Sequence, residues 1–209
     1  MTVETAALRP GYAISRVIKG GWQLAGDHGP VDRAEAVRDM EAFLDAGITA
    51  LDCADIYTGV EEMIGDFIAE LRRRRGADVA DRVQVHTKLV PDLGLLANCR
   101  PEDIEAIVDR SLKRLRIERL HLVQFYWWDL AVGDPLAAMA VLQRCQAKGK
   151  IAHLGVTNWD VAETRDFVAA GADLVSTQVQ YSLLDRRAEA GLTAWAAQHG
   201  LQLLCYGTL

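Results

Sequence analysis

The sequence predicts an α/β protein built on a (β/α)8 barrel of the TIM type. Short apolar segments alternate with longer amphipathic segments at a spacing of roughly 25–35 residues, a pattern typical of βα units. Glycines follow the amphipathic segments, where a helix commonly ends in the left-handed conformation. Strands that alternate with helices pair in parallel through right-handed crossovers, so we expect a single domain over residues 1–209.

Strands and helices are expected in strict alternation. Each predicted strand is a short apolar run, and each predicted helix places its apolar residues on one face. The seven strands are Arg16–Gly20, Ile48–Cys53, Val83–Lys88, Leu120–Tyr126, Ile151–Val156, Leu174–Gln180 and Leu201–Tyr206. The six helices are Arg33–Ala46, Val60–Arg75, Pro101–Leu115, Pro135–Ala147, Val161–Ala170 and Arg187–His199. Two of these helices start with proline, which is well suited to the first helical turn.

The segment after the first strand favours a barrel over an open dinucleotide-binding sheet. Such a sheet needs a Gly-x-Gly-x-x-Gly turn at this point, whereas the sequence continues as Lys19-Gly20-Gly21-Trp22-Gln23 into a long loop. A barrel needs eight strands, however, and the eighth βα unit is missing. The chain is therefore expected to be either a fragment of a longer protein or a short form that closes its barrel with a second chain.

A missing eighth strand would leave unpaired edges on the first and seventh strands. Unpaired edges promote association between chains, so self-association through the open barrel edges is expected. We also expect inward-facing apolar side chains beside the gap, including Val17 and Leu203, to be partly open to water.

The composition excludes several classes of partner. The chain has 23 Lys and Arg against 29 Asp and Glu, a net charge of −6 that argues against nucleic acid or an anionic membrane as the main partner. Its 4 cysteines are scattered without the spacing of metal ligands, so no metal site is predicted. No apolar run approaches the ~20 residues of a membrane span, and the first residues lack the pattern of a signal peptide. A cytoplasmic location is expected.

Unusual side chains stand where the predicted strands end. Asp52 and Lys88 end the second and third strands, and Tyr57 follows Asp52 in the next loop. In a barrel, the carboxyl ends of the strands carry the reacting groups. A phenol with a pKa near ~10 is a poor acid at neutral pH, but a nearby ammonium would favour its ionised form, and Asp52 would keep that ammonium charged. From these residues alone, an acid catalyst and a buried ion pair beside an unrelated tyrosine are about equally plausible.

Five motifs, in order along the chain, resemble the aldo-keto reductase family from about Ser15 to Leu209. They are Asp52-x-Ala54-x-x-Tyr57, Glu61 or Glu62 with Gly65, Thr87-Lys88, Gly155-Val156-Thr157-Asn158 and the run from Gln178 to Arg186. The resemblance implies a barrel oxidoreductase that transfers a hydride between NAD(P)H and a small-molecule aldehyde or ketone. It favours NADP (NADPH) over NAD, although the family's segment for the adenosine 2′-phosphate is not in this sequence.

The resemblance also implies a role for each matching residue. Tyr57 would be the general acid, with Lys88 and Asp52 as its tuning pair. Further residues would hold the cofactor: Thr157, Asn158, Gln178, Tyr206, Gly207, Thr208 and Leu209. Three tryptophans would line the mouth of the substrate site: Trp22, Trp127 and Trp128. Aromatic walls of this kind suit an apolar or aromatic carbonyl compound.

One position departs from the family pattern. The family usually carries a histidine at the end of the fourth strand, where this sequence has Tyr126. A phenol can donate a hydrogen bond to a carbonyl, but it cannot shuttle protons near neutral pH as imidazole does. No other histidine is a clear replacement, and only His28 is expected on the same rim. Reduction of a carbon–carbon double bond, a non-catalytic cofactor-binding or interaction module, and a Schiff-base aldolase that uses Lys88 stay open as alternatives.

Overall fold

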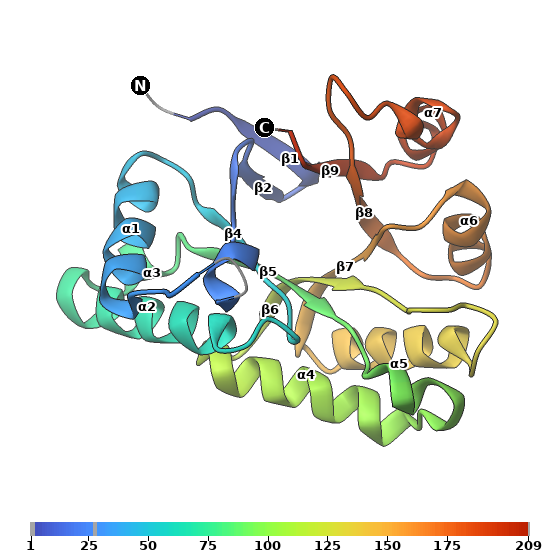
Figure 1. Ribbon diagram of the computed structural model, residues 1–209, viewed down its shortest axis with the longest axis horizontal. Helices are drawn as coiled ribbons and strands as arrows, with labels where there is room; N and C mark the ends of the chain where they lie inside the picture. Colours follow the sequence, from blue (N-terminus) through green and yellow to red (C-terminus); the bar gives the residue numbers. More distant parts are fainter. Residues whose placement is uncertain (1–2, 27–28, 209) are drawn as a thin grey trace.

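A seven-stranded parallel sheet, curled and covered by helices on its outer side, forms the body of the protein (Figure 1). The computed structural model describes residues 3–26 and 29–208. The strands follow one another in chain order, and each pairs in parallel with the next. They are β3 (Ile18–Gly20), β4 (Ala50–Asp52), β5 (Gln84–Leu89), β6 (Leu120–Phe125), β7 (Ile151–Thr157), β8 (Leu174–Gln180) and β9 (Gln202–Tyr206). The prediction of an α/β fold of the barrel type is confirmed.

The helices follow the predicted alternation, with two differences. They are α1 (Arg33–Asp45), α2 (Val60–Arg75), α3 (Ala77–Ala80), α4 (Pro101–Leu115), α5 (Pro135–Ala147), α6 (Val161–Ala169) and α7 (Leu192–Gln198). The short helix α3 is an addition. The predicted helix Arg187–His199 is wrong in its first part, because Gly191 has φ 121° and separates a 3₁₀ turn at Arg187–Glu189 from α7.

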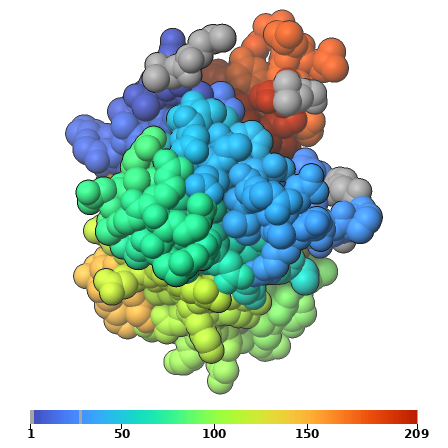
Figure 2. Space-filling view, turned by 90° about the vertical axis from the view of Figure 1, so that its left-hand side faces the viewer, coloured from blue at the N-terminus to red at the C-terminus, as the bar shows by residue number. Residues whose placement is uncertain are grey.

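The outer face of the sheet packs against the helices and forms the main core. Helix α2 contributes Phe67 and Leu71 to this core, and β6 contributes Phe125. Figure 2 shows the flank where α1 (light blue) and α2 (green) lie side by side above α4 (yellow-green). Gly65 of α2 lies against α4, since a Cβ atom at this position would lie 2.2 Å from the carbonyl oxygen of Arg114. The missing side chain therefore lets the two helices approach closely.

An antiparallel hairpin, absent from the prediction, closes the amino-terminal end of the curled sheet. It consists of β1 (Thr5–Arg9) and β2 (Tyr12–Ser15), joined at Pro10 and Gly11, where Gly11 has φ 82°. Its apolar side chains pack inside the sheet with those of four strands, in a cluster of Leu8, Tyr12, Ile14, Ala50, Leu122, Val175 and Leu204. Arg9 also forms an ion pair with Asp173, 2.5 Å away at the start of β8. The hairpin is thus a plug at the end opposite the strands' carboxyl ends.

The two outer strands of the sheet, β3 and β9, each pair with one neighbour in the part of the chain that the structure describes. Val17, just before β3, is 53% exposed, but its neighbour Ile18 is the residue that packs against the interior cluster. The expectation for Leu203 is wrong: Leu204 faces the interior, whereas Leu203 packs outward against the cluster of Val179, Ala188 and Leu192. Both faces of β9 carry leucine, so the alternation of its sequence did not settle which face is inward. Within residues 3–26 and 29–208, no helix has the length and apolarity to cross a membrane.

Candidate active site

A cleft of about 520 Å³ lies at the carboxyl ends of the strands. All seven strands or the loops that follow them contribute to its lining: Gly20, Trp22, Gln23, Asp52, Ala54, Ile56, Tyr57, Lys88, Val90, Tyr126, Trp128, Thr157, Asn158, Gln178, Tyr206 and Gly207. Two hollows of about 630 and 610 Å³ are larger, but neither contains Asp52, Tyr57 or Lys88. We place the candidate site in the smaller cleft because the titratable groups that could perform chemistry meet there.

Lys88 and Asp52 form a largely buried ion pair at the base of this cleft. The Lys88 Nζ atom lies 2.5 Å from Asp52 Oδ2 and donates a second hydrogen bond to the carbonyl oxygen of Cys53 at 3.2 Å. Burial by itself lowers the pKa of Lys88, but the neighbouring Asp52 and Tyr57 outweigh burial and raise this pKa above its ordinary value. Lys88 is therefore a fixed ammonium at neutral pH.

Two glutamines hold the other oxygen of Asp52. The Nε2 atoms of Gln124 and Gln178 both donate to Asp52 Oδ1 at 2.8 Å. Gln124 comes from β6, is fully buried and was missed by the sequence analysis. Its signal was an amide in the otherwise apolar run Leu122–Phe125, since a buried amide needs a hydrogen-bond partner. The carboxylate thus accepts from three side chains, and its position is fixed by β5, β6 and β8.

Tyr57 lies above the ion pair, on the loop between β4 and α2. Its ring centroid is 5.4 Å from Lys88 Nζ. Burial raises the pKa of Tyr57, and the charge of Lys88 lowers it by less, so the net direction is upward. As expected, the charge of Lys88 by itself favours the phenolate of Tyr57, but burial has the larger effect on this pKa. Tyr57 is therefore a protonated phenol beside a fixed cation, and the expected net lowering of its pKa is not found in this structure.

Aromatic side chains form one wall of the cleft. The rings of Tyr126 and Trp128 meet edge to face with centroids 5.3 Å apart, and Trp128 Nε1 donates to the Pro91 carbonyl oxygen at 2.9 Å. Trp22, on a 3₁₀ turn at Trp22–Ala25, lines the same cleft and is 52% exposed. These three rings give the cleft a wide apolar face beside the polar base.

Trp127 does not belong to this wall, and the prediction that it lines the substrate mouth is wrong. It is only 2% exposed, packs against Phe125 at 5.8 Å between ring centroids and donates from Nε1 to the Val132 carbonyl oxygen at 2.9 Å. The chain leaves β6 with Tyr126 and Trp128 facing the cleft, so the residue between them faces the helices.

The residues expected to hold a cofactor lie at the ends of β7, β8 and β9. Thr157 Oγ1 and the Asn158 backbone N–H both donate to the Gln178 carbonyl oxygen, at 3.1 and 2.8 Å. Asn158 adopts φ 59°, and its Oδ1 accepts a 2.7 Å hydrogen bond from the Tyr206 hydroxyl. Gly207, at φ 67°, follows directly at the rim of the cleft. Thr208 is exposed beyond it, and Leu209 and His28 lie outside the described residues.

Among the described residues, no histidine lines this cleft. His86 lies deeper in the barrel, and its Nε2 is 2.9 Å from the Tyr12 hydroxyl of the hairpin. Burial lowers the pKa of His86 to about 4, so it is neutral at physiological pH. Within the described part of the chain, no group of three His, Cys, Asp or Glu side chains could hold a metal ion. The chemistry of the cleft is therefore that of a carboxylate, an ammonium and three phenols, those of Tyr57, Tyr126 and Tyr206.

Comparison with known proteins assigns the family. A sequence model of the Aldo/keto reductase family matches residues 16–209, and the chain therefore belongs to the aldo/keto reductase family. It is 31% identical to the aldo-keto reductase YhdN of Bacillus subtilis, over 98% of this chain and 61% of that protein. It is 28% identical to the NADH-specific methylglyoxal reductase of Escherichia coli, over 94% of this chain and 64% of that protein.

A solved structure gives the same result in three dimensions. The aldo-keto reductase from Klebsiella pneumoniae in complex with NADPH superposes with a TM-score of 0.78 at 27% identity, covering 99% of this chain and 68% of that one. Measured against the two curated relatives named above, the chain spans less than two thirds of their length.

Proposed function

We propose that this chain carries the catalytic centre of an NAD(P)H-dependent carbonyl reductase, with Tyr57 as the general acid. The proposal rests on one observation above all, the meeting of Tyr57 with the Lys88–Asp52 ion pair in a cleft with an aromatic wall. The substrate is a small aldehyde or ketone, and the apolar wall of Trp22, Tyr126 and Trp128 favours an apolar or aromatic one.

The donors and acceptors around Asn158 suit a nicotinamide carboxamide. Gln178 uses its amide nitrogen on Asp52 and keeps its Oε1 as an acceptor, while Asn158 uses its oxygen on Tyr206 and keeps its amide nitrogen as a donor. The half-exposed ring of Tyr206 offers a flat face beside them, and Thr157, Gly207, Thr208 and Leu209 complete the proposed cofactor site. We propose NADPH over NADH. The Klebsiella pneumoniae complex supports NADPH, whereas the Escherichia coli relative named as NADH-specific makes a test of both necessary.

In this proposal each residue of the cleft has a separate task. The nicotinamide supplies the hydride when it is bound. Tyr57 gives its hydroxyl proton to the carbonyl oxygen of the substrate, and the ammonium of Lys88 stabilises the phenolate that remains. Asp52 holds Lys88 in its charged form. Tyr126 donates a hydrogen bond to the substrate oxygen from the aromatic wall and thereby polarises the carbonyl group.

The test is the oxidation of NADPH and of NADH with methylglyoxal as the substrate, since two Escherichia coli relatives are named as methylglyoxal reductases. Tyr57→Phe should lower kcat by about 10²–10⁴-fold, the usual contribution of a positioned acid. Tyr181→Phe is the matched control, because the hydroxyl of Tyr181 bonds to Glu189 and lies outside the cleft. Cofactor binding without turnover by the unchanged chain would favour the non-catalytic alternative.

The Schiff-base alternative is disfavoured by the state of Lys88. An amine must lose its proton to attack a carbonyl carbon, whereas Asp52 and Tyr57 raise the pKa of Lys88. Borohydride should therefore fail to trap methylglyoxal on Lys88, and a reduced adduct at this residue would reverse the assignment.

We further propose that the chain self-associates through β3 and β9, the outer strands of the sheet in the described structure. Their free backbone groups and the exposed Val17 are the supporting features. Sedimentation at increasing concentration should show dimers or larger species, and a monomer at all concentrations would contradict the proposal.

A further inference from the structure

Two carboxylates flank Tyr57 in the chain, and both are buried. Asp55 precedes Tyr57 by two residues, Glu61 follows it by four, and their side chains are 0% and 1% exposed. A carboxylate is removed from water at a high cost unless hydrogen bonds and opposite charges surround it. Both carboxylates therefore need partners. These partners connect the segment between Asp55 and Glu61 to the rest of the protein.

Asp55 attaches the Tyr57 loop to the end of β5. Its Oδ1 accepts from the Val90 backbone N–H at 2.9 Å, and its own N–H donates to the Lys88 carbonyl oxygen at 3.0 Å. Its second oxygen, Oδ2, accepts from Arg110 Nη2 of α4 at 2.9 Å. Asp55 thus joins the loop, the backbone on either side of Leu89 and an outer helix.

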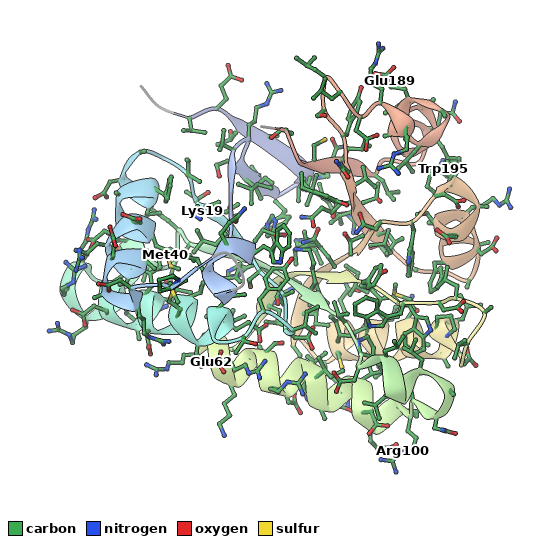
Figure 3. All side chains as sticks on the ribbon, in the orientation of Figure 1. Lys19, Met40, Glu62, Arg100, Glu189 and Trp195 are labelled. Atoms are coloured by element: carbon green, nitrogen blue, oxygen red, sulfur yellow. The ribbon has the colours of Figure 1, made fainter. Side chains whose placement is uncertain are left out.

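Glu61 makes the equivalent connection on the other side of Tyr57. Its Oε1 accepts from Thr87 Oγ1 at 2.7 Å, and Thr87 directly precedes Lys88. Its Oε2 accepts from Arg114 Nη1 at 3.3 Å, and the same Nη1 atom donates to the Asp55 carbonyl oxygen at 2.9 Å. The Arg114 Nε atom lies 3.0 Å from Glu62 Oε1, at the place where α2 meets α4 (Figure 3).

The two arginines stand four residues apart on α4, so they share one face of the helix. We propose that Arg110 and Arg114 are positioning residues that, through Asp55 and Glu61, fix the Tyr57 loop relative to Lys88. We call these four residues the arginine clamp. Neither arginine lines the cleft, so the clamp acts only through the groups it holds. The inference rests on the proposed function of Tyr57 and Lys88.

The test compares charge removal with charge retention at each arginine. Arg114→Met should lower kcat about 10- to 100-fold with KM changed by less than about twofold, because a small misplacement of a reacting group acts mainly on the chemical step. Arg110→Lys should stay within about threefold of the unchanged protein, since one ammonium can replace its single contact. Arg114→Lys should not recover activity, because one ammonium cannot reproduce the contacts of Arg114 with Glu61, Glu62 and the Asp55 carbonyl oxygen.

Arg72→Met is the matched control. Arg72 pairs with Asp81 on the surface, away from the cleft, so the kcat of Arg72→Met should equal that of the unchanged protein. The double variant Asp55→Asn with Arg110→Met removes an ion pair without leaving a buried charge, and it replaces the single variants if these do not fold. It should also lose kcat about 10-fold or more at an unchanged KM.

Amide hydrogen exchange separates this inference from the proposed function. Residues 53–60 should exchange at least about 10-fold faster in Arg114→Met than in Arg72→Met, whether or not the chain reduces a carbonyl. Unchanged exchange in this segment, or a folded double variant with full kcat and wild-type exchange, would overturn the clamp. Faster exchange in a chain without reductase activity would support the clamp and reject the proposed function alone.

Discussion

The two ends of the curled sheet differ in the charge of the polar groups that they bury, although the same strands form both ends. At the carboxyl end, Asp52 and Lys88 are charged, and each charge is met by hydrogen bonds from neighbouring strands. At the amino end, the polar groups inside the sheet are kept neutral: the Tyr12 hydroxyl bonds to His86, and the Tyr12 ring stacks on His153 at 4.2 Å. Two residues of β5, His86 and Lys88, therefore belong to different environments. The charged base of the cleft is therefore an arrangement specific to one end and is not a property of the whole interior.

The largest effect is expected from removing the charge at the cleft. Lys88→Met deletes the ammonium that would stabilise the Tyr57 phenolate, and kcat for carbonyl reduction should fall by about 10²–10⁴-fold. Stopped-flow turnover with methylglyoxal measures this loss. Lys19→Met, which removes an ammonium near the surface beside Phe43, is the control and should retain full activity. Equal losses in both variants would mean that the charged base has no special role.

A smaller effect is expected at the aromatic wall. Tyr126→Phe removes one hydrogen-bond donor and should lower carbonyl reduction by about 10- to 100-fold, the scale of one positioned donor. Tyr126→His should maintain or raise the rate. An unchanged rate in Tyr126→Phe would identify this side chain as a wall of the cleft only.

The amino end should respond to pH through His86. Burial lowers its pKa from 6.5 to about 4. Between these two pH values, the His86 imidazole is therefore protonated in the unfolded chain and neutral in the folded chain. Stability from this residue is complete above pH 6.5 and declines toward pH 4, by at most about 1.4 kcal/mol per pH unit. Urea unfolding of His86→Gln across this range should show a shallower decline. Burial also raises the pKa of Asp55, to about 6, and this shift adds stability as the pH falls. It does so equally in the unchanged protein and in His86→Gln. Parallel curves would contradict the prediction.

The smallest effect is expected from the hairpin. Tyr12→Phe removes the hydroxyl that bonds to His86 and should lower the free energy of unfolding by about 0.5–1.5 kcal/mol, with carbonyl reduction unchanged. Unfolding and turnover measured on the same sample distinguish the two ends. A loss of activity larger than the loss of stability would show that the ends are coupled.

The sequence predicts the barrel from local patterns, and it predicts most of the cleft from those patterns together with the resemblance to a known family. Strands such as Leu120–Phe125 are short and mostly apolar, and polar residues at strand ends must meet on one rim. Side chains whose environment depends on a distant segment were not predictable in this way. Trp127 and Trp128 are identical and adjacent, and only the packing of β6 against the helices decides which one reaches the cleft. Gln124 could be recognised as a buried amide, but its partner Asp52 lies 72 residues away.

The hairpin illustrates the same limit. Its Pro10-Gly11 turn is a readable signal, but the strands on either side are short and of weak β pattern. Their apolar residues become a plug only because the open end of the sheet supplies Leu122, Val175 and Leu204 as partners. The direction of the Tyr57 pKa shift likewise depends on how deeply its loop is buried. The spacing of residues in the sequence does not reveal that depth.

Gly65 sets the distance between α2 and α4, because an added methyl group would collide with the Arg114 carbonyl oxygen. Any larger residue must push the helices apart, and the guanidinium of Arg114 would withdraw from Glu61 by a similar amount. A mutational scan should therefore record Gly65 as intolerant, although no side chain exists there and the position is absent from the cleft lining. For protein engineering, the consequence is that the contact between Arg114 and Glu61 depends on a position outside the cleft lining, which a choice of variants limited to the cleft would overlook.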